Sequence, residues 1–494
     1  MQLLKVYLQE TGMRLPTELV PLFFLTYIAH ILRQHAFGIQ VWTYALVMLT
    51  IGIFSTAIRL YAQTELNKMP PDKKGNSHFF WGVWSIQVIT FAVLALLTYG
   101  FVQLFDLPYE GAIRLQLLFY VGAMLDISWL FNGINKTRIV VRRDAIIQMA
   151  RFVPLIIFVK SPDDLAAFIL LLAITTIIGN VVMWFKLPQT LVRVDVARIP
   201  IRRHMRLMTT FFLAAILPQL ALYLNKVLLF WHDGVDEVAS YYSAELMVKV
   251  GIALVLGIGI AMMGRVVEQR RQGDASGVQQ SFYDAVENST ALAIIIAVGV
   301  AIVGSQTVYW FLGIDYEQVG AILHVLAFVI VVASWRYSLA LQQLAAERGF
   351  RNLSMPVQIA TGLNVVLSLA LIPWLGVMAA AWIALVSEIV ALVLQLLSLR
   401  HVIHLWRLVA VVWRYIVAGV VTAVVLIAMV RAGVPAYPKY SALEAAVGLV
   451  VYALVVVSFD TPVAKATNQV LLFSGKRMFE STIEFIRIVL RIKK

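Results

Sequence analysis

The chain has 494 residues, of which 61% are hydrophobic and only 14% are charged, and its mean hydropathy is +0.85. Ordinary soluble domains carry about 25% charged residues, so this composition excludes a water-soluble protein. The absence of cysteine excludes a disulfide framework and a thiolate metal site. The net charge of +13 does not indicate binding to nucleic acid, because the basic residues lie between apolar segments and not on one amphipathic surface.

Long apolar runs predict an all-α polytopic membrane protein with about 14 transmembrane helices. Each crossing needs about 20 apolar residues, which leaves room only for short loops and tails. Residues 1–15 are expected to form an interfacial segment, because they lack the small-residue cleavage site of a secretory signal. The spans are expected at 16–33, 38–59, 79–103, 113–133, 144–160, 165–186, 207–230, 239–263, 285–312, 318–345, 354–374, 377–399, 411–431 and 441–459.

The connections between these spans alternate in charge. The turns on one side hold acidic pairs such as Asp163 with Asp164 and Asp236 with Glu237. Cytoplasmic loops of membrane proteins carry an excess of lysine and arginine, so the basic side is expected in the cytoplasm together with both termini. The basic connections are 68–74, 136–143, 193–206, 265–271 and 348–351.

The longest basic connection predicts how the chain is divided. Residues 191–206 separate a first six spans from a second six, and we expect them to link an N-terminal lobe (16–190) to a C-terminal lobe (207–400). Two further spans lie within 401–460. In 461–494 apolar and basic residues alternate, which is typical of a cytoplasmic helix lying on anionic membrane lipid. A solvated tail is the alternative.

Charged residues inside the predicted spans are the best candidates for a functional site. Each would cost about 2.5–3.5 kcal/mol against lipid, so these side chains are expected to face protein or water. Glu245 and Lys249 are four residues apart with the acid first, which favours an ion pair on one helix. The residues singled out on this ground are Asp126, Arg151, Lys226, Glu245, Lys249, Arg336 and Glu388.

Arg151 and Arg336 have no opposite charge one turn away, so each needs a partner elsewhere. That partner is either Asp126 or Glu388 on another helix, or an anionic substrate in a central cavity. Lys226 lies near the outer end of its span and either snorkels to the interface or joins such a site. The sequence has no P-loop and no histidine cluster completed by an acid, so neither a cofactor nor a metal is expected.

Three stretches resemble a known family. Residues 129–192 run from an aromatic-rich helix end through a basic loop to an apolar helix that closes in Val-Lys before a short acidic turn. Residues 214–268 carry a Tyr-Tyr pair after an acidic turn, and 30–52 form the third match. The pattern resembles the polysaccharide repeat-unit flippases, or oligosaccharide translocases, of the multidrug/oligosaccharidyl-lipid/polysaccharide exporter (MOP) superfamily. Asn225 departs from it, because many relatives are expected to carry an acid there.

The resemblance implies two six-helix lobes around a central cavity plus two extra C-terminal helices, in a bacterial cytoplasmic membrane. The implied cargo is an oligosaccharide on a polyprenyl diphosphate, and the implied partners are a polysaccharide polymerase and glycosyltransferases. Arginine and lysine suit a diphosphate through charge-assisted hydrogen bonds. We therefore expect the substrate to be bound by Arg151, Lys249, Arg336 and Lys226, and an ion-coupling or pairing role for Asp126, Glu245 and Glu388.

Two other functions compete with a flippase. A multidrug or other lipid exporter of the same superfamily would favour an acidic cavity for cationic substrates, whereas four of the seven charged residues singled out in the spans are basic. A membrane-embedded glycan polymerase or ligase would need a sizeable outer loop for catalytic residues, and the predicted outer loops are short. The sequence therefore favours a transporter and not an enzyme.

Overall fold

The computed structural model describes residues 2–69, 73–187, 201–345, 350–401 and 403–459, and within these ranges every regular element is helical. The predicted tail, 461–494, and most of the predicted linker lie outside them. The predicted interfacial segment is continuous with the first helix. The first-half helices are α1 (Gln2–Lys68), α2 (Lys73–Phe105), α3 (Glu110–Gln116), α4 (Leu118–Leu125), α5 (Ser128–Gly133), α6 (Thr137–Ala150), α7 (Phe152–Phe158), the 3-10 turn η1 (Pro162–Asp164) and α8 (Leu165–Trp184).

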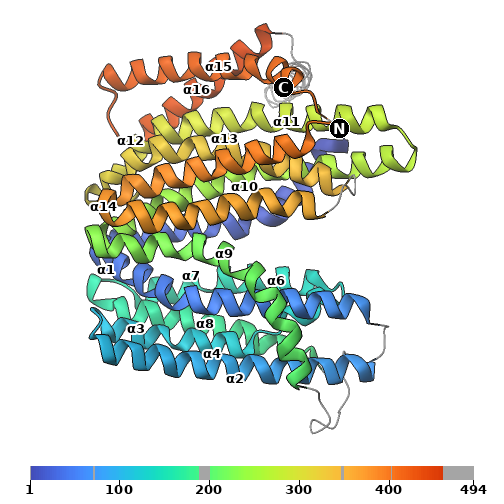
Figure 1. Cartoon of the computed structure of the whole chain (residues 1–494). Coiled ribbons are helices and arrows are strands. Elements are labelled where there is room, and N and C mark those ends of the chain that lie inside the picture. Colours follow the sequence, from blue (N-terminus) through green and yellow to red (C-terminus); the bar gives the residue numbers. More distant parts are fainter. Residues whose placement is uncertain (1, 70–72, 188–200, 346–349, 402, 460–494) are drawn as a thin grey trace, which may run out of the picture.

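The second half begins with a helix, drawn in green, that runs obliquely from beside α2 to the middle of the molecule (Figure 1). Its elements are α9 (Ile201–Asp233), α10 (Val235–Arg271), α11 (Ala275–Val298), the π-helical turn η4 (Gly299–Gly304), α12 (Ser305–Phe311), the 3-10 turn η5 (Ile314–Tyr316), α13 (Gln318–Ala345), α14 (Phe350–Leu399), α15 (Leu405–Arg431) and α16 (Pro438–Ser458).

The predicted membrane spans are confirmed as helices. Eleven helical stretches of the described residues are long and apolar enough to cross a membrane. Two of them bend sharply, at Arg33 in α1 (φ 57°) and at Gly376 in α14 (φ 62°), so each supplies two of the predicted spans. The span expected at 144–160 is formed by the short helices α6 and α7, which meet at Arg151.

The span expected at 113–133 is not one continuous helix, because it breaks between Leu125 and Ser128. A break inside a membrane frees backbone carbonyl groups that must find donors within the protein. Gln87 Nε2 donates to the carbonyls of Ala123 (2.7 Å) and Asp126 (2.8 Å). The indole groups of Trp84 and Trp184 donate to two further carbonyls in the same stretch. Side chains of α2 and α8 therefore supply hydrogen-bond donors for the carbonyl groups that the break leaves free.

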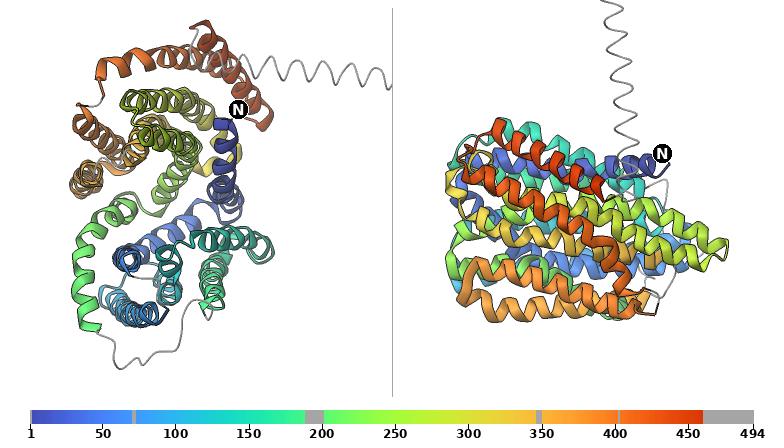
Figure 2. Two further views of the ribbon diagram at one scale, coloured as in Figure 1. Left: turned by 90° about the vertical axis from the view of Figure 1, so that its right-hand side faces the viewer. Right: turned by 90° about the horizontal axis from the view of Figure 1, so that it is seen from above.

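The helices form two groups with α1 and α9 between them. Figures 1 and 2 show α2–α8, in blue to teal, on one side and α10–α16, in yellow-green to red, on the other. Helix α1 contacts α2, α5 and α10, while α9 contacts α1, α2 and α14. Large apolar side chains such as Leu96 and Leu104 on α2 are exposed on the outside, which suits contact with lipid.

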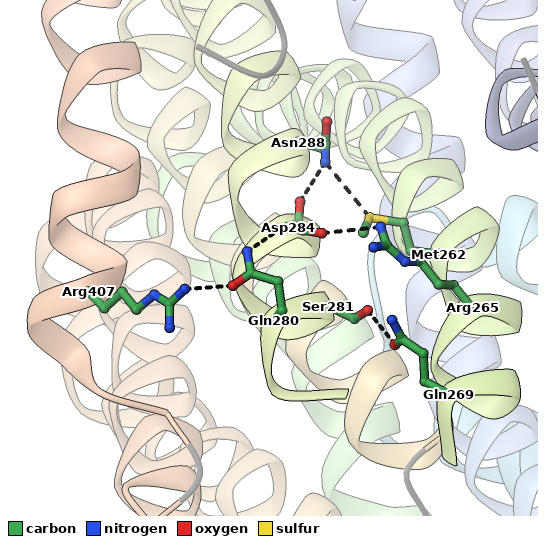
Figure 3. A network of polar contacts seen from close by, with 8 residues as sticks. All are labelled: Met262, Arg265, Gln269, Gln280, Ser281, Asp284, Asn288 and Arg407. Atoms are coloured by element: carbon green, nitrogen blue, oxygen red, sulfur yellow. Dashed lines mark hydrogen bonds and ion pairs between the residues drawn. The ribbon is translucent and has the colours of Figure 1, made fainter. Parts of the chain in front are cut away.

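Polar contacts hold α15 against other helices of the second group (Figure 3). Arg407 at the start of α15 donates to Gln280 on α11, and Gln280 donates to Asp284. Asp284 also pairs with Arg265 on α10 at 3.2 Å. Helix α15 is thus bound directly to α11, and Asp284 links α11 in turn to α10.

Candidate functional site

A cavity of about 440 Å³ lies between the two groups of helices. Its walls come from both parts of α1, from α4, α6, Arg151 and α8 on one side, and from α9 and α10 on the other. Four of the charged residues that the sequence singled out line this cavity: Arg151, Lys226, Glu245 and Lys249.

Arg151 reaches the cavity from the junction between α6 and α7. Its Nε donates to the hydroxyl of Thr175, and its Nη2 donates to the hydroxyl of Thr176, both at 2.8 Å on α8. The side chain is half-buried, and among the described residues it forms no ion pair. The two threonines hold the guanidinium in place without neutralising its charge.

Two lysines share one carboxylate on the opposite wall. Glu245 Oε2 lies 2.7 Å from Lys226 Nζ, and its Oε1 lies 2.9 Å from Lys249 Nζ. The Lys226 side chain is only 5% exposed and also donates to the carbonyl of Leu222, so Lys226 does not snorkel to the interface. The Lys249 side chain is 43% exposed. The pairing of Glu245 with Lys249 is therefore present, with Lys226 as an additional partner.

The rest of the cavity lining offers hydroxyl groups, amide groups and apolar surface. Tyr44, Tyr223 and Tyr242 line the cavity with Gln40 and Gln148. The Oε1 atom of Gln148 is buried without a hydrogen-bond partner. The tyrosine hydroxyls and the glutamine amides can exchange hydrogen bonds with sugar hydroxyls, and the tyrosine rings can stack on sugar rings. The first part of α1 adds an apolar face with Pro21, Phe24, Leu25 and Ile28.

The charge balance of the lining favours an anion. Three cationic side chains face one carboxylate, and the two lysines already share that carboxylate. Charge-assisted hydrogen bonds from arginine and lysine to phosphate are among the strongest polar contacts, and a low-dielectric surrounding strengthens them. The arrangement can therefore hold a ligand with a phosphate or carboxylate group.

Arg336 lies elsewhere, in the second group of helices. Its Nε and Nη2 donate to the two carboxylate oxygens of Glu388 at 2.6 and 3.1 Å, and its guanidinium stacks over Tyr337 at 4.2 Å. The Arg336 side chain is 8% exposed and does not line the cavity. Of the two interpretations that the sequence left open for Arg336, the structure contains the pairing with Glu388, so substrate binding by Arg336 is not retained.

Asp126 also lies outside the cavity lining, at the break between α4 and α5. Its two carboxylate oxygens accept hydrogen bonds from the backbone N–H and the hydroxyl of Ser128. Asp126 thus holds Ser128, the first residue of α5, through two hydrogen bonds.

Helices α1 and α10 touch beside the cavity, on the side where the sequence predicts the outer turns. Gln34 donates to the hydroxyl of Ser240 at 2.9 Å, and His35 Nδ1 lies 3.0 Å from Asp236 Oδ1. The ring of Trp42 stacks on Phe230 of α9 with centroids 4.0 Å apart. These contacts join the part of α1 that follows its bend to α9 and to the beginning of α10.

Some buried acids and cavity residues were missed by the sequence analysis. Glu287 and Glu444 are buried within spans predicted at 285–312 and 441–459, and Glu287 accepts a hydrogen bond from Tyr415 at 2.9 Å. Both acids could have been found from the sequence, because a charged residue within a predicted span is itself a sign of burial in protein. The cavity tyrosines gave none, because tyrosine is common at span ends and does not stand out in an apolar run.

Comparisons with known proteins agree with this architecture. The model of the family described as "Polysaccharide biosynthesis protein" matches residues 11–263. No curated protein matches the chain. The lipid II flippase MurJ in an inward closed conformation has a similar fold, with a TM-score of 0.70 at 12% identity, covering 90% of this chain and 98% of that chain.

Two transporters of the MOP superfamily also share the fold. An inward-facing multidrug resistance MATE family transporter gives a TM-score of 0.55 at 16% identity, covering 79% of this chain and 95% of that chain. A transporter from Pyrococcus furiosus, described as having a binding pocket of reverse polarity, gives 0.51 at 14% identity, covering 83% and 96%.

The fold and its central cavity define a multi-pass membrane protein with the architecture of MOP superfamily flippases and transporters. The family match covers more than half of the sequence, and the chain therefore belongs to the polysaccharide biosynthesis protein family. The family expected from the sequence is confirmed.

Proposed function

We propose that this protein is a flippase that moves an oligosaccharide linked to a polyprenyl diphosphate across the bacterial cytoplasmic membrane. The observation that carries the proposal is the cavity in which Arg151, which forms no ion pair among the described residues, shares the lining with Lys226 and Lys249. The diphosphate would bind these cations, and the tyrosines and glutamines would contact the sugars nearest to it. Translocation would follow from alternating access of the cavity to the two sides.

The family and the cavity together favour this cargo over a cationic drug. A lining with three cations and one carboxylate repels a cationic ligand and attracts an anionic one. Within the proposal, both termini lie in the cytoplasm, residues 461–494 contact anionic lipid, and a polymerase and glycosyltransferases act on the same lipid-linked sugar.

A vesicle assay tests the proposal directly. Purified protein is reconstituted into liposomes that contain a polyprenyl-diphosphate-linked disaccharide, and transport is followed by the accessibility of the sugar to an enzyme added outside. Charge-assisted hydrogen bonds contribute about 1.5–3 kcal/mol, so Arg151→Ala should slow transport roughly ten- to a hundredfold.

Arg114→Ala is the matched control, because Arg114 is exposed on α3 and pairs locally with Glu110. It should leave transport unchanged. Normal transport in the Arg151→Ala variant would overturn the assignment of the cavity. Transport of a cationic dye in place of the lipid-linked sugar would favour a multidrug exporter.

A further inference from the structure

Glu245 occupies an unusual place for a carboxylate in a cavity that suits anions. It lies on α10 and contacts one lysine from α9 and one from its own helix, at 2.7 and 2.9 Å. All three side chains line the cavity. The carboxylate therefore takes the position that a negatively charged ligand group would take if it bound both lysines.

The two lysines are held unequally by Glu245 and its surroundings. Lys226 is nearly fully buried and keeps a second contact with the carbonyl of Leu222 at 2.8 Å. Lys249 is 43% exposed, and its contact with Glu245 spans one turn of the same helix. Lys249 can thus turn to an incoming ligand first, and Lys226 exchanges Glu245 for the ligand only when the anionic group takes the place of the carboxylate.

We propose that Glu245 substitutes for the anionic group of the cargo in the empty cavity and takes up one proton from the solvent when the cargo displaces it. This proposal rests on the proposed function. In the empty cavity Glu245 keeps the lysines ordered and partly neutralised. In the loaded cavity the lysines and Arg151 contact the diphosphate, and Glu245 loses its cations.

The proton uptake follows from the surroundings of Glu245. An ionised carboxylate in a membrane interior is costly unless cations compensate it, and removing the partners of a buried ion leaves that cost unmet. The titratable and charged groups that face Glu245 are Lys226 and Tyr223 from α9, and Tyr241, Tyr242 and Lys249 from its own helix. The remaining titratable groups of the cavity lining are Tyr44 on α1 and Arg151 between α6 and α7.

With the lysines turned to phosphate, the groups that remain around Glu245 are phenols, which carry no positive charge. Protonation then converts the carboxylate into a neutral acid that can donate a hydrogen bond to one of these hydroxyls. The same proton leaves when the cargo departs and the lysines return. Loading of the cargo and protonation of Glu245 are therefore linked.

Calorimetry of the full-length protein in detergent tests the linkage, with farnesyl diphosphate as a soluble isoprenoid diphosphate. Titrations at one pH in buffers of different ionisation enthalpy give the number of protons taken up per ligand bound. The wild-type protein should take up about one proton more than Glu245→Gln. Binding to the wild-type protein should also tighten by up to about tenfold for each unit decrease in pH, relative to the variant.

Glu245→Gln provides the control for protonation of the ligand itself, because both proteins bind the same diphosphate. The variant should bind farnesyl diphosphate about tenfold more tightly than the wild type at pH 8, since its lysines lack the competing carboxylate. Equal proton counts for the two proteins would overturn the role of Glu245 and leave the proposed function standing. Failure of the wild-type protein to bind farnesyl diphosphate at any pH would overturn both.

A second measurement does not depend on Glu245→Gln. Infrared difference spectra of the wild-type protein should show the carbonyl band of a protonated carboxylic acid when farnesyl diphosphate is added. Glu245→Asp, which keeps a carboxylate, should keep this band. If no such band appears although the ligand binds, Glu245 does not exchange a proton with the cargo.

Discussion

Gly38 on α1 lies directly against the backbone carbonyl of Val235 on α10. A Cβ atom at position 38 would stand 2.0 Å from that oxygen, far inside van der Waals contact. Since the neighbour is backbone, it cannot move aside as the end of a flexible side chain could. The glycine therefore permits the close approach of α1 and α10 beside the cavity.

Gly38→Ala should separate α1 from α10, because overpacking typically costs about 1–3 kcal/mol. The chain has no cysteine, so His35→Cys and Asp236→Cys allow two spin labels to be attached at this contact. The distance between the labels should lengthen in the Gly38→Ala background. Gly100→Ala is the control, because a Cβ there meets nothing within 4 Å. Identical distances in both backgrounds would contradict the role of Gly38.

Gln87 should be important for stability, because its amide connects the break between α4 and α5 to α2. Gln87→Leu removes the donor from the carbonyls of Ala123 and Asp126, and each buried group left without a partner costs about 1–3 kcal/mol. The midpoint of thermal unfolding in detergent should fall clearly. Gln103→Leu, at an exposed position of the same helix, should change it little. A similar decrease in both variants would mean that the hydrogen bonds at the break are not the cause.

The ion pair between Arg336 and Glu388 should be needed for stability and not for transport. Arg336→Met leaves the carboxylate of Glu388, which is 26% exposed, without its partner. Breaking a fully buried pair costs about 3–5 kcal/mol, which is the upper bound here, whereas replacing both partners by apolar residues is often neutral. The double variant Arg336→Met, Glu388→Leu should therefore regain the thermal stability lost in the single variant and transport lipid-linked sugar at a normal rate. A stable double variant without transport would return Arg336 to the substrate site.

His204 should give the stability of the protein a dependence on pH. It lies outside the membrane spans, is buried, and its Nδ1 is 2.6 Å from the hydroxyl of Tyr61. Burial and the nearby charge of Arg203 lower the pKa of His204 below its ordinary value of 6.5. The unfolded chain therefore binds the proton more readily than the folded protein does, and stability is lost as the pH falls below about 6.5.

Thermal unfolding measured between about pH 5 and pH 8 checks this expectation for His204. The midpoint of the wild-type protein should decrease toward the acidic end, and His204→Gln should remove part of that decrease. His401→Gln is the matched control, because His401 is exposed. An equal loss of stability at low pH in the wild type and in His204→Gln would assign the effect to other groups.

Much of the fold could be predicted from the sequence, because a membrane crossing needs a long apolar run and such runs are visible without an alignment. The two bends were also predictable in position: the expected spans end at Arg33 and resume after Gly376. The break after Leu125 was not, because it depends on donors from Gln87 and Trp184, which come from other helices. Nothing in residues 113–133 reveals those partners.

The candidate site was predictable only in part. The spacing of Glu245 and Lys249 predicts a contact one turn apart, and this contact is present. The choice between a partner and a substrate for Arg151 and Arg336 depends on which helices lie side by side. Arg336 faces Glu388 across two helices of one group, whereas Arg151 faces threonines and the cavity. The residues next to Arg151 and Arg336 in the sequence do not indicate which of the two pairs with an acid.

The origin of the cavity cations has a mechanical consequence. Arg151 belongs to the helices on one side of the cavity, and Lys226 and Lys249 belong to those on the other. A diphosphate bound to all three would bridge the two halves and resist their separation. Any movement that separates the two halves would lengthen the contacts that bind the diphosphate. Opening of the cavity and weakening of diphosphate binding would therefore occur together.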